Sequence, residues 1–269
     1  MAPIVRFDAP LGITHIGTAT AIIHLNGVNL ITDPVFSPAG TTWDLGFVTL
    51  KIKDAPAFKL ADLPHIDAVL LSHEDHPDNL DELGRVLLDG RHVFTTPDGA
   101  KKLGPRPGVR AMKDWETLPL EIGSRRFEIT GTPCQHLPGG EVTGFILTNP
   151  SFGQTDGKPN AIYFSGDTIY LPELAKMKEK YHISVAMLNI GKATAPLPTG
   201  DLVITMDGAN AARLFKEIGA DLLVPMHFES WGHFAEKREE LEKALEKEGV
   251  MDKVLWLEPG VRTNVVQPH

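Results

Sequence analysis

The feature that most constrains the fold is a short segment of acids and histidines directly after an apolar run. Residues 66–71 (IDAVLL) have the length and composition of a buried strand, and residues 80–88 then repeat apolar side chains at helical spacing. The segment HEDHPD, residues 73–78, lies between the two. Loops at strand ends present side chains from a rigid sheet with little reorganisation, so this segment is a candidate metal site at a sheet edge.

Three other predicted strands finish in a side chain of the same kind. His136 follows the strand sequence RRFEITGTP, Asp167 follows AIYFSG, and His227 follows LLVPM. Each one alone has an ordinary explanation, because a histidine at a strand end is usually a structural group and an aspartate often caps a helix or a turn. Four strand ends that all finish in metal-competent side chains instead favour one shared metal site.

The order of the elements predicts two sheets with helices packed outside them. Strands dominate the first two thirds of the chain, and helices at 208–218 and 234–248 then interleave with the last strands, the final one at 254–257. No linker, charge block or low-complexity segment divides the sequence. We therefore expect a single domain over residues 1–269.

Composition and charge limit the partners of the chain. A formal net charge of −9 opposes binding to nucleic acid or to an anionic membrane, since both require clustered Lys and Arg facing phosphate. Cys134 is the only cysteine, which excludes a cysteine-built zinc site. The N-terminal sequence has no apolar run of signal-peptide length, and no stretch approaches the ~18 apolar residues of a membrane span. We expect a cytoplasmic protein that acts on a small molecule.

Segments over nearly the whole chain resemble the metallo-β-lactamase superfamily, and within it the branch of L-ascorbate-6-phosphate lactonase and the N-acylphosphatidylethanolamine-hydrolysing phospholipases. The resemblance is carried by ITHIGTATAIIHLNGVNLITDPVF at 13–36, LLSHEDHPDNLD at 70–81, the His136 segment, YFSGDT at 163–168 and VPMHFESW at 224–231. It implies an α/β fold, the four-layer αββα sandwich. It also implies one or two metal ions, zinc above all with manganese or iron as alternatives, and a metal-bound hydroxide that attacks a lactone, an ester or a phosphoester.

The segment 73–78 departs from the family's usual string, His-x-His-x-Asp-His, and three alignments describe it. The first inserts one residue after His73, so that Asn79 replaces the final histidine as a weaker, neutral ligand. The second keeps the original spacing and makes Asp75 a carboxylate ligand, and the third treats residues 73–76 as the end of the motif. The first is preferred because the residues on both sides of the string keep their neighbours. Asp75 is retained as a candidate ligand or as a partner that orients an imidazole.

On this alignment the resemblance assigns metal-binding side chains to two groups. Three histidines, two from segment 73–78 and one at position 136, would form a three-nitrogen site with an open position. Asp78 and His227 would form a second site, which Asp167 bridges to the first and which Asn79 weakens. The predicted ligands are His73, Asp75, His76, Asp78, His136, Asp167 and His227.

Catalytic roles are expected from side chains in and beside these groups. Asp78 or Asp167 would orient the nucleophile and shuttle its proton. His233, in the sequence HFESWGHF, would contact the substrate or protonate the leaving group, with a structural histidine at the start of the 234–248 helix as the alternative. Asp33 resembles an aspartate that supports the ligands in this branch, with a plain turn residue as the alternative.

The leading functional hypothesis is a metal-dependent hydrolase that acts on a small molecule. One alternative is a metal-poor or non-catalytic descendant that binds a ligand, which the altered string motivates. Another is an iron-dependent redox enzyme, which a mixed set of carboxylate and imidazole ligands allows. The loops at 35–58 and 192–202, expected to shape specificity, contain no motif that identifies a substrate. The symmetric assemblies of the branch make a homo-oligomer a further expectation.

Overall fold

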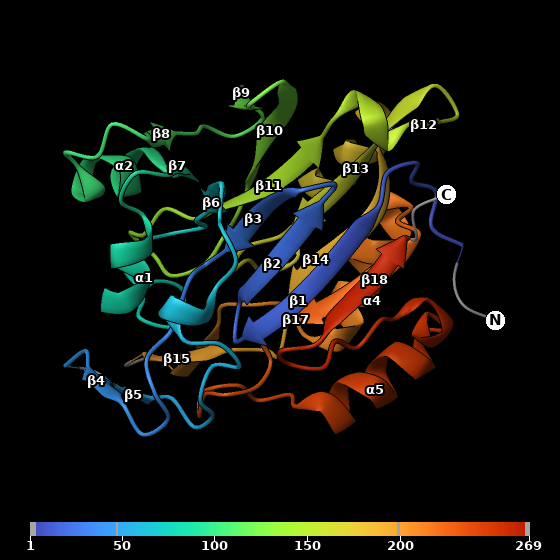
Figure 1. Ribbon diagram of the computed structural model, residues 1–269. Coiled ribbons are helices and arrows are strands. Elements are labelled where there is room, and N and C mark those ends of the chain that lie inside the picture. The colour runs from blue at the N-terminus through green and yellow to red at the C-terminus, as the bar shows by residue number, and fades with distance from the viewer. Residues whose placement is uncertain (1–3, 47, 198–199, 267–269) are drawn as a thin grey trace.

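Two large sheets organise the chain in the computed structural model, which describes residues 4–46, 48–197 and 200–266 (Figure 1). The first sheet has the strand order β18-β1-β2-β3-β6-β7-β8. Its strands are β1 (Leu11–Gly17), β2 (Thr20–Leu25), β3 (Val28–Thr32), β6 (Ala68–Leu70), β7 (His92–Thr95), β8 (Val109–Ala111) and β18 (Arg262–Val266). Strands β1 to β3 form an antiparallel meander, and β6, β7 and β8 extend it in parallel.

The second sheet has the strand order β17-β14-β13-β11-β10-β9, with β12 paired to β13. Its strands are β9 (Thr117–Ile122), β10 (Arg125–Pro133), β11 (Thr143–Thr148), β12 (Gln154–Thr155), β13 (Lys158–Phe164), β14 (His182–Asn189) and β17 (Leu222–Met226). Strand β11 runs antiparallel to both β10 and β13, while β13, β14 and β17 are parallel. Strands β10, β13, β14 and β17 therefore all end at the same edge of this sheet.

Helices and two small hairpins complete the described residues. The helices are α1 (Glu82–Leu87), α2 (Pro97–Leu103), α3 (Met177–Lys180), α4 (Gly208–Ile218) and α5 (Arg238–Lys247), with 3-10 turns η1 (Leu60–Asp62), η2 (Pro150–Phe152), η3 (Pro172–Lys176) and η4 (Met251–Lys253). The hairpins are β4 (Thr42–Asp44) with β5 (Thr49–Lys51), and β15 (Thr194–Leu197) with β16 (Gly200–Val203). These hairpins occupy the two expected specificity loops, of which residues 47, 198 and 199 lie outside the described residues.

Three apolar layers hold the architecture together. Between the sheets, side chains such as Ile13 and Phe145 form the central core. Outside the first sheet, α1 and α2 pack on its outer face through residues such as Leu87 and Leu103, and α4 packs on the second sheet through residues such as Leu214. Figure 1 shows α1 and α2 on the opposite side of the molecule from α4 and α5. The expected αββα sandwich is therefore confirmed.

The C-terminal part differs from the expectation in two places. The predicted strand at 254–257 contributes only a single bridge, from Val254 to Leu223, and the last strand of the described residues is β18, which pairs with β1. The predicted helix at 234–248 begins at Arg238, because Phe234 is bridged to Ala193 and cannot enter a helix. Among the described residues, no helix is both long and apolar enough to cross a bilayer.

Candidate metal centre

Four strand ends bring acids and histidines to one side of the sandwich. Strand β6 of the first sheet ends just before His73, whereas β10, β13 and β17 of the second sheet end just before His136, Asp167 and His227. The parallel direction of these three strands places their ends at one edge, as the order of the sheet requires. The course of the backbone thus brings the four separated segments to one side of the molecule, as predicted.

Three imidazoles form the compact part of the centre. The Nε2 atom of His73 lies 2.9 Å from Nδ1 of His76, and Nε2 of His136 lies 3.3 Å from that same atom. One nitrogen from each ring lies within 4.8 Å of the other two. Nitrogens bound tetrahedrally at about 2.0–2.1 Å from zinc would be roughly 3.3 Å apart, so the spacing fits one ion bound by three nitrogens.

The outward nitrogens of two rings are held by hydrogen bonds that leave the inward nitrogens free. The Ser72 hydroxyl donates to Asp33 at 2.7 Å, so its oxygen accepts from Nδ1–H of His73 at 2.8 Å. Nδ1–H of His136 donates to the carbonyl of Ile204 at 2.7 Å. Both bonds place the proton on Nδ1 and leave the Nε2 lone pair directed at the cluster, which is the form that binds a metal.

A second group lies beside the three imidazoles. Nε2 of His227 is 3.4 Å from Oδ2 of Asp167 and 3.5 Å from Oδ2 of Asp78. Oδ2 of Asp78 also lies 3.2 Å from Nε2 of His233. The His227 side chain is 0% exposed, and neither ring nitrogen makes a hydrogen bond within the described residues. A buried imidazole between two carboxylates, without hydrogen-bonded partners, is an environment that a cation would satisfy.

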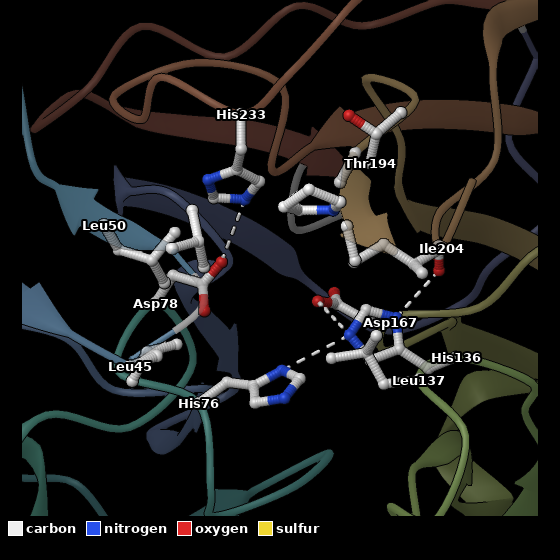
Figure 2. Close-up of a pocket in the computed structure, with 14 residues that line it drawn as sticks. Leu45, Leu50, His76, Asp78, His136, Leu137, Asp167, Thr194, Ile204 and His233 are labelled. Atoms are coloured by element: carbon white, nitrogen blue, oxygen red, sulfur yellow. Dashed lines mark hydrogen bonds and ion pairs between the residues drawn. The ribbon is translucent and has the colours of Figure 1, made fainter. Parts of the chain in front are cut away.

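Asp167 contacts members of both groups, and Figure 2 shows it beside His136. Its Oδ1 accepts a hydrogen bond of 2.7 Å from the Asn189 side chain, which fixes the carboxylate. Its Oδ2 is 4.0 Å from Nε2 of His136 in one group and 3.4 Å from Nε2 of His227 in the other. This position is the one that a bridging carboxylate would take.

Burial and charge set the protonation states that a cation needs. Burial lowers the pKa of His73 and His136, so both rings are neutral near pH 7. Burial alone would raise the pKa of Asp167, yet the nearby His227 holds it well below its usual range. Burial alone would lower the pKa of His227, but the charges of Asp167 and Asp78 raise it to about 10. His227 therefore carries a proton, and this positive charge lies between the two carboxylates, where a metal cation would bind.

Two residues named by the sequence lie apart from the cluster. The Asp75 side chain is 36% exposed, and its carboxylate lies 4.0 Å from the Lys102 ammonium. The prediction that counted Asp75 among the ligands is not supported by this position. Asn79 is buried, and its amide donates to Asp33 at 3.0 Å. The one-residue insertion after His73 is therefore the alignment that agrees with the structure.

Neighbouring charges explain where the inserted residue goes. The Glu74 carboxylate pairs with Arg85 and with Lys102, at 3.0 Å in each case. This pairing ties Glu74 to α1 and α2, while the imidazole nitrogens of His73 and His76 lie 2.9 Å apart. Asp81, not Asp78, caps α1 by accepting from the Gly84 amide, which leaves Asp78 available to the site.

Further groups support the site, and two of them were not identified from the sequence. Asn189 ends the apolar strand β14 and is a fifth polar strand end, so the same pattern could have found it. The Ile204 carbonyl is a backbone group that no side-chain pattern reveals. Asp33, expected as either a support or a turn residue, accepts from both the amide and the hydroxyl of Ser72 and so supports the site.

A pocket opens onto both groups and has mainly apolar walls (Figure 2). Its polar floor consists of His76, Asp78, His136, Asp167 and His233, with Thr194 at the side. The walls come from the β4–β5 and β15–β16 hairpins and from segments next to them. They are formed by Leu45, Val48, Leu50, Leu137, Ala193, Ala195, Pro196 and Ile204.

Comparison with known proteins assigns the chain to a family. Residues 28–228 match the family model described as the beta-lactamase superfamily domain. A metal-dependent hydrolase family protein of Methanopyrus kandleri is 24% identical and covers 92% of this chain and 97% of its own length. The mitochondrial N-acyl-phosphatidylethanolamine-hydrolyzing phospholipase D of Saccharomyces cerevisiae is 25% identical over 93% of this chain. This chain spans only 55% of the yeast protein and 61% of a similar, uncharacterized protein of Mycobacterium tuberculosis.

The fold is shared with solved structures. An isothiocyanate hydrolase from Delia radicum gut bacteria superposes with a TM-score of 0.74, at 23% identity over 94% of this chain and 98% of that one. Because the family model matches residues 28–228, the chain belongs to the beta-lactamase superfamily. The predicted superfamily is confirmed, and a similar protein of Methanopyrus kandleri is named a metal-dependent hydrolase, whereas the narrower likeness to L-ascorbate-6-phosphate lactonase is not confirmed.

Proposed function

We propose that the chain hydrolyses a small carboxylic ester or lactone that carries an apolar group, and that it does so with metal held by the two groups of side chains. His73, His76 and His136 would hold one ion, and Asp78 and His227 a second, with Asp167 between them. Three nitrogens without a thiolate suit zinc, with manganese and iron as the alternatives. A bound ion of this kind supplies Lewis acidity, which lowers the pKa of water to about 7 and polarises a carbonyl oxygen.

The observation that carries the choice of substrate is the contrast between the pocket's floor and its walls. Eight of the wall residues are apolar, and no lysine or arginine lies among the described residues that line the pocket. An apolar substituent would gain free energy from burial against Leu50 and Ile204. A permanently charged phosphoester would meet these walls without a cationic side chain to pair with, which costs free energy.

The chain's own acids would handle the proton of the attacking water. The pKa of Asp78 lies well below its usual range, because His227 and His233 outweigh the effect of burial. Asp167 is ionised as well, because His227 lowers its pKa in the same way. Both carboxylates face the floor of the pocket. Each can orient a water molecule by accepting a hydrogen bond from it. Asp78, next to His233, is placed to take up the proton of that water.

Elemental analysis and a substrate series would test the proposal. We expect bound transition metal in the purified chain, and hydrolysis of p-nitrophenyl esters whose kcat/KM rises from acetate to octanoate. The phosphodiester bis(p-nitrophenyl) phosphate should react more slowly. His136→Ala should lose at least a hundredfold in kcat/KM, whereas His65→Ala, an exposed histidine paired with Asp67, should not change it.

Other outcomes would identify the alternatives. A faster reaction with the phosphodiester would favour a phosphoester as the substrate, in line with the name of the yeast relative. Iron in the preparation with oxygen consumption, and no hydrolysis, would favour a redox enzyme. Transition metal well below one ion per chain would favour a ligand-binding descendant.

A further inference from the structure

The Asp78 carboxylate faces two imidazoles. Its Oδ2 lies 3.2 Å from Nε2 of His233 and 3.5 Å from Nε2 of His227. The His233 side chain is 14% exposed, and Figure 2 shows its ring above Asp78, across the pocket from His76 and His136. His233 therefore belongs to the same polar floor as the side chains at the strand ends, although it comes from an irregular loop.

The loop holds the His233 ring in this place by packing and by backbone hydrogen bonds. The ring centroid lies 4.5 Å from that of Phe234 and 6.1 Å from that of Trp231. Phe234 in turn lies 4.9 Å from the ring of His227. The carbonyl of His233 accepts a hydrogen bond from the amide of Thr194 at 3.4 Å. The ring is thus positioned before any ligand arrives.

Asn79 offers no imidazole to the second group. Its Nδ2 donates to Asp33, and its Oδ1 is buried without a hydrogen-bond partner in the part of the chain that is described. Without His233, the second group would offer two carboxylates but only one imidazole, His227. Nε2 of His233, at 3.2 Å from Oδ2 of Asp78, places a second imidazole beside this group.

We propose that His233 is a ligand of the second metal position, together with Asp78, His227 and Asp167. It supplies through Nε2 the second imidazole that Asn79 does not provide, so that the chain holds two ions. This inference rests on the proposed function, because it needs the two groups to bind metal. It also replaces the expectation that His233 donates a proton from Nε2, since a ring nitrogen bound to a cation carries no proton.

The test is a zinc titration of the metal-depleted chain. Isothermal titration calorimetry and elemental analysis after dialysis should give two ions per chain for the wild type. His233→Ala should keep the first ion with unchanged affinity and lose at least tenfold in affinity for the second. His233→Cys, which offers a thiolate at a similar place, should recover part of this loss. His65→Ala serves as the control and should bind like the wild type, while circular dichroism and thermal melting verify that each variant is folded.

Cobalt adds a readout that does not depend on activity. Co²⁺ bound at the second position should give a visible absorption band in the wild type that His233→Ala shifts or loses, whereas the band of the first ion stays. Two ions with unchanged affinities in a folded His233→Ala variant would overturn the assignment of His233 alone. Equal weakening of both ions would also overturn it, because it would indicate a structural role. A wild-type chain that binds no zinc would overturn the proposed function as well.

Discussion

The Asp33 carboxylate accepts two hydrogen bonds from Ser72, one from the backbone amide and one from the hydroxyl, each 2.7 Å long. The hydroxyl in turn accepts from His73, so that a single buried carboxylate orients the first imidazole of the cluster. Burial raises the pKa of Asp33 to about 7 even though three hydrogen bonds oppose this. The structure thus keeps a costly buried acid where it fixes a ring.

The first prediction concerns this chain of hydrogen bonds. Ser72→Ala removes the acceptor of the His73 Nδ1 proton and leaves the ring free to rotate. We expect zinc affinity at the three-imidazole site to fall by about 10- to 100-fold, the usual effect of losing such a partner. Competition with a chromophoric chelator measures it. Ser184→Ala is the matched control, because that hydroxyl donates to Arg6 far from the site; an equal loss there would refute the role of Ser72.

The second prediction concerns protons released on metal binding. His227 has a pKa of about 10 in the metal-free chain, so it carries a proton at pH 8, whereas His73 and His136 are already neutral. Binding of a cation at His227 must displace that proton. Calorimetry in two buffers of different ionisation enthalpy should report release of about one proton per chain. His227→Asn should abolish it, and a wild-type heat that is the same in both buffers would contradict the assignment.

Much of the site could be predicted because it follows regular strands. His136, Asp167 and His227 each come after an apolar run of strand length, and the periodicity of such runs depends only on local sequence. Their convergence follows from the parallel order of β10, β13 and β17. The sandwich and its metal-competent edge were therefore accessible before the structure was known.

The residues that could not be predicted depend on tertiary contacts. Spacing alone allows Asp75 or His76 to face the cluster. In the structure the preceding residue, Glu74, pairs with Arg85 and Lys102, and the spacing within the segment does not encode these contacts. The position of His233 also depends on tertiary contacts. The helix that follows it starts at Arg238, later than the apolar periodicity of residues 234–248 suggests. The bridge between Phe234 and Ala193 keeps that stretch irregular and turns His233 toward Asp78.

The third prediction concerns acid stability and the buried His24. Its Nδ1 lies 2.8 Å from Oδ1 of Asn29 and its Nε2 lies 2.9 Å from the Thr14 hydroxyl, so both ring nitrogens are hydrogen-bonded inside the protein. Burial lowers the pKa of His24 below its usual 6.5. The unfolded chain therefore binds the proton more readily, and the stabilising effect of the neutral ring is complete above pH 6.5 and is lost as the pH falls below it.

Thermal melting of the metal-depleted chain between pH 8 and pH 5 would measure this effect. The wild type should lose melting temperature as the pH falls, and part of that slope should disappear in His24→Gln. Other buried histidines, such as His73, contribute to the slope of both proteins, so only the difference between the two is assigned to His24. Identical slopes would show that His24 is not responsible.

The fourth prediction concerns the apolar wall of the pocket. Leu50 is half-buried and lines the pocket, whereas its neighbour Thr49 on β5 is exposed, because successive side chains of a strand point to opposite faces. Leu50→Ala should lower kcat/KM for p-nitrophenyl octanoate by about tenfold, since apolar contacts of this size contribute ~1–3 kcal/mol to discrimination. The acetate ester, too short to reach the wall, should be hydrolysed within twofold of the wild-type rate.

Thr49→Ala separates pocket contact from damage to the hairpin. It lies on the same short strand but its side chain faces away, so both esters should be hydrolysed as by the wild type. If Leu50→Ala slowed both esters equally, the hairpin would affect the arrangement of the metal-binding side chains. Leu50 would then not distinguish short from long acyl groups. If it slowed neither, the apolar substituent would have to contact another apolar residue of the pocket, such as Ile204, and the same comparison would then be made with Ile204→Ala.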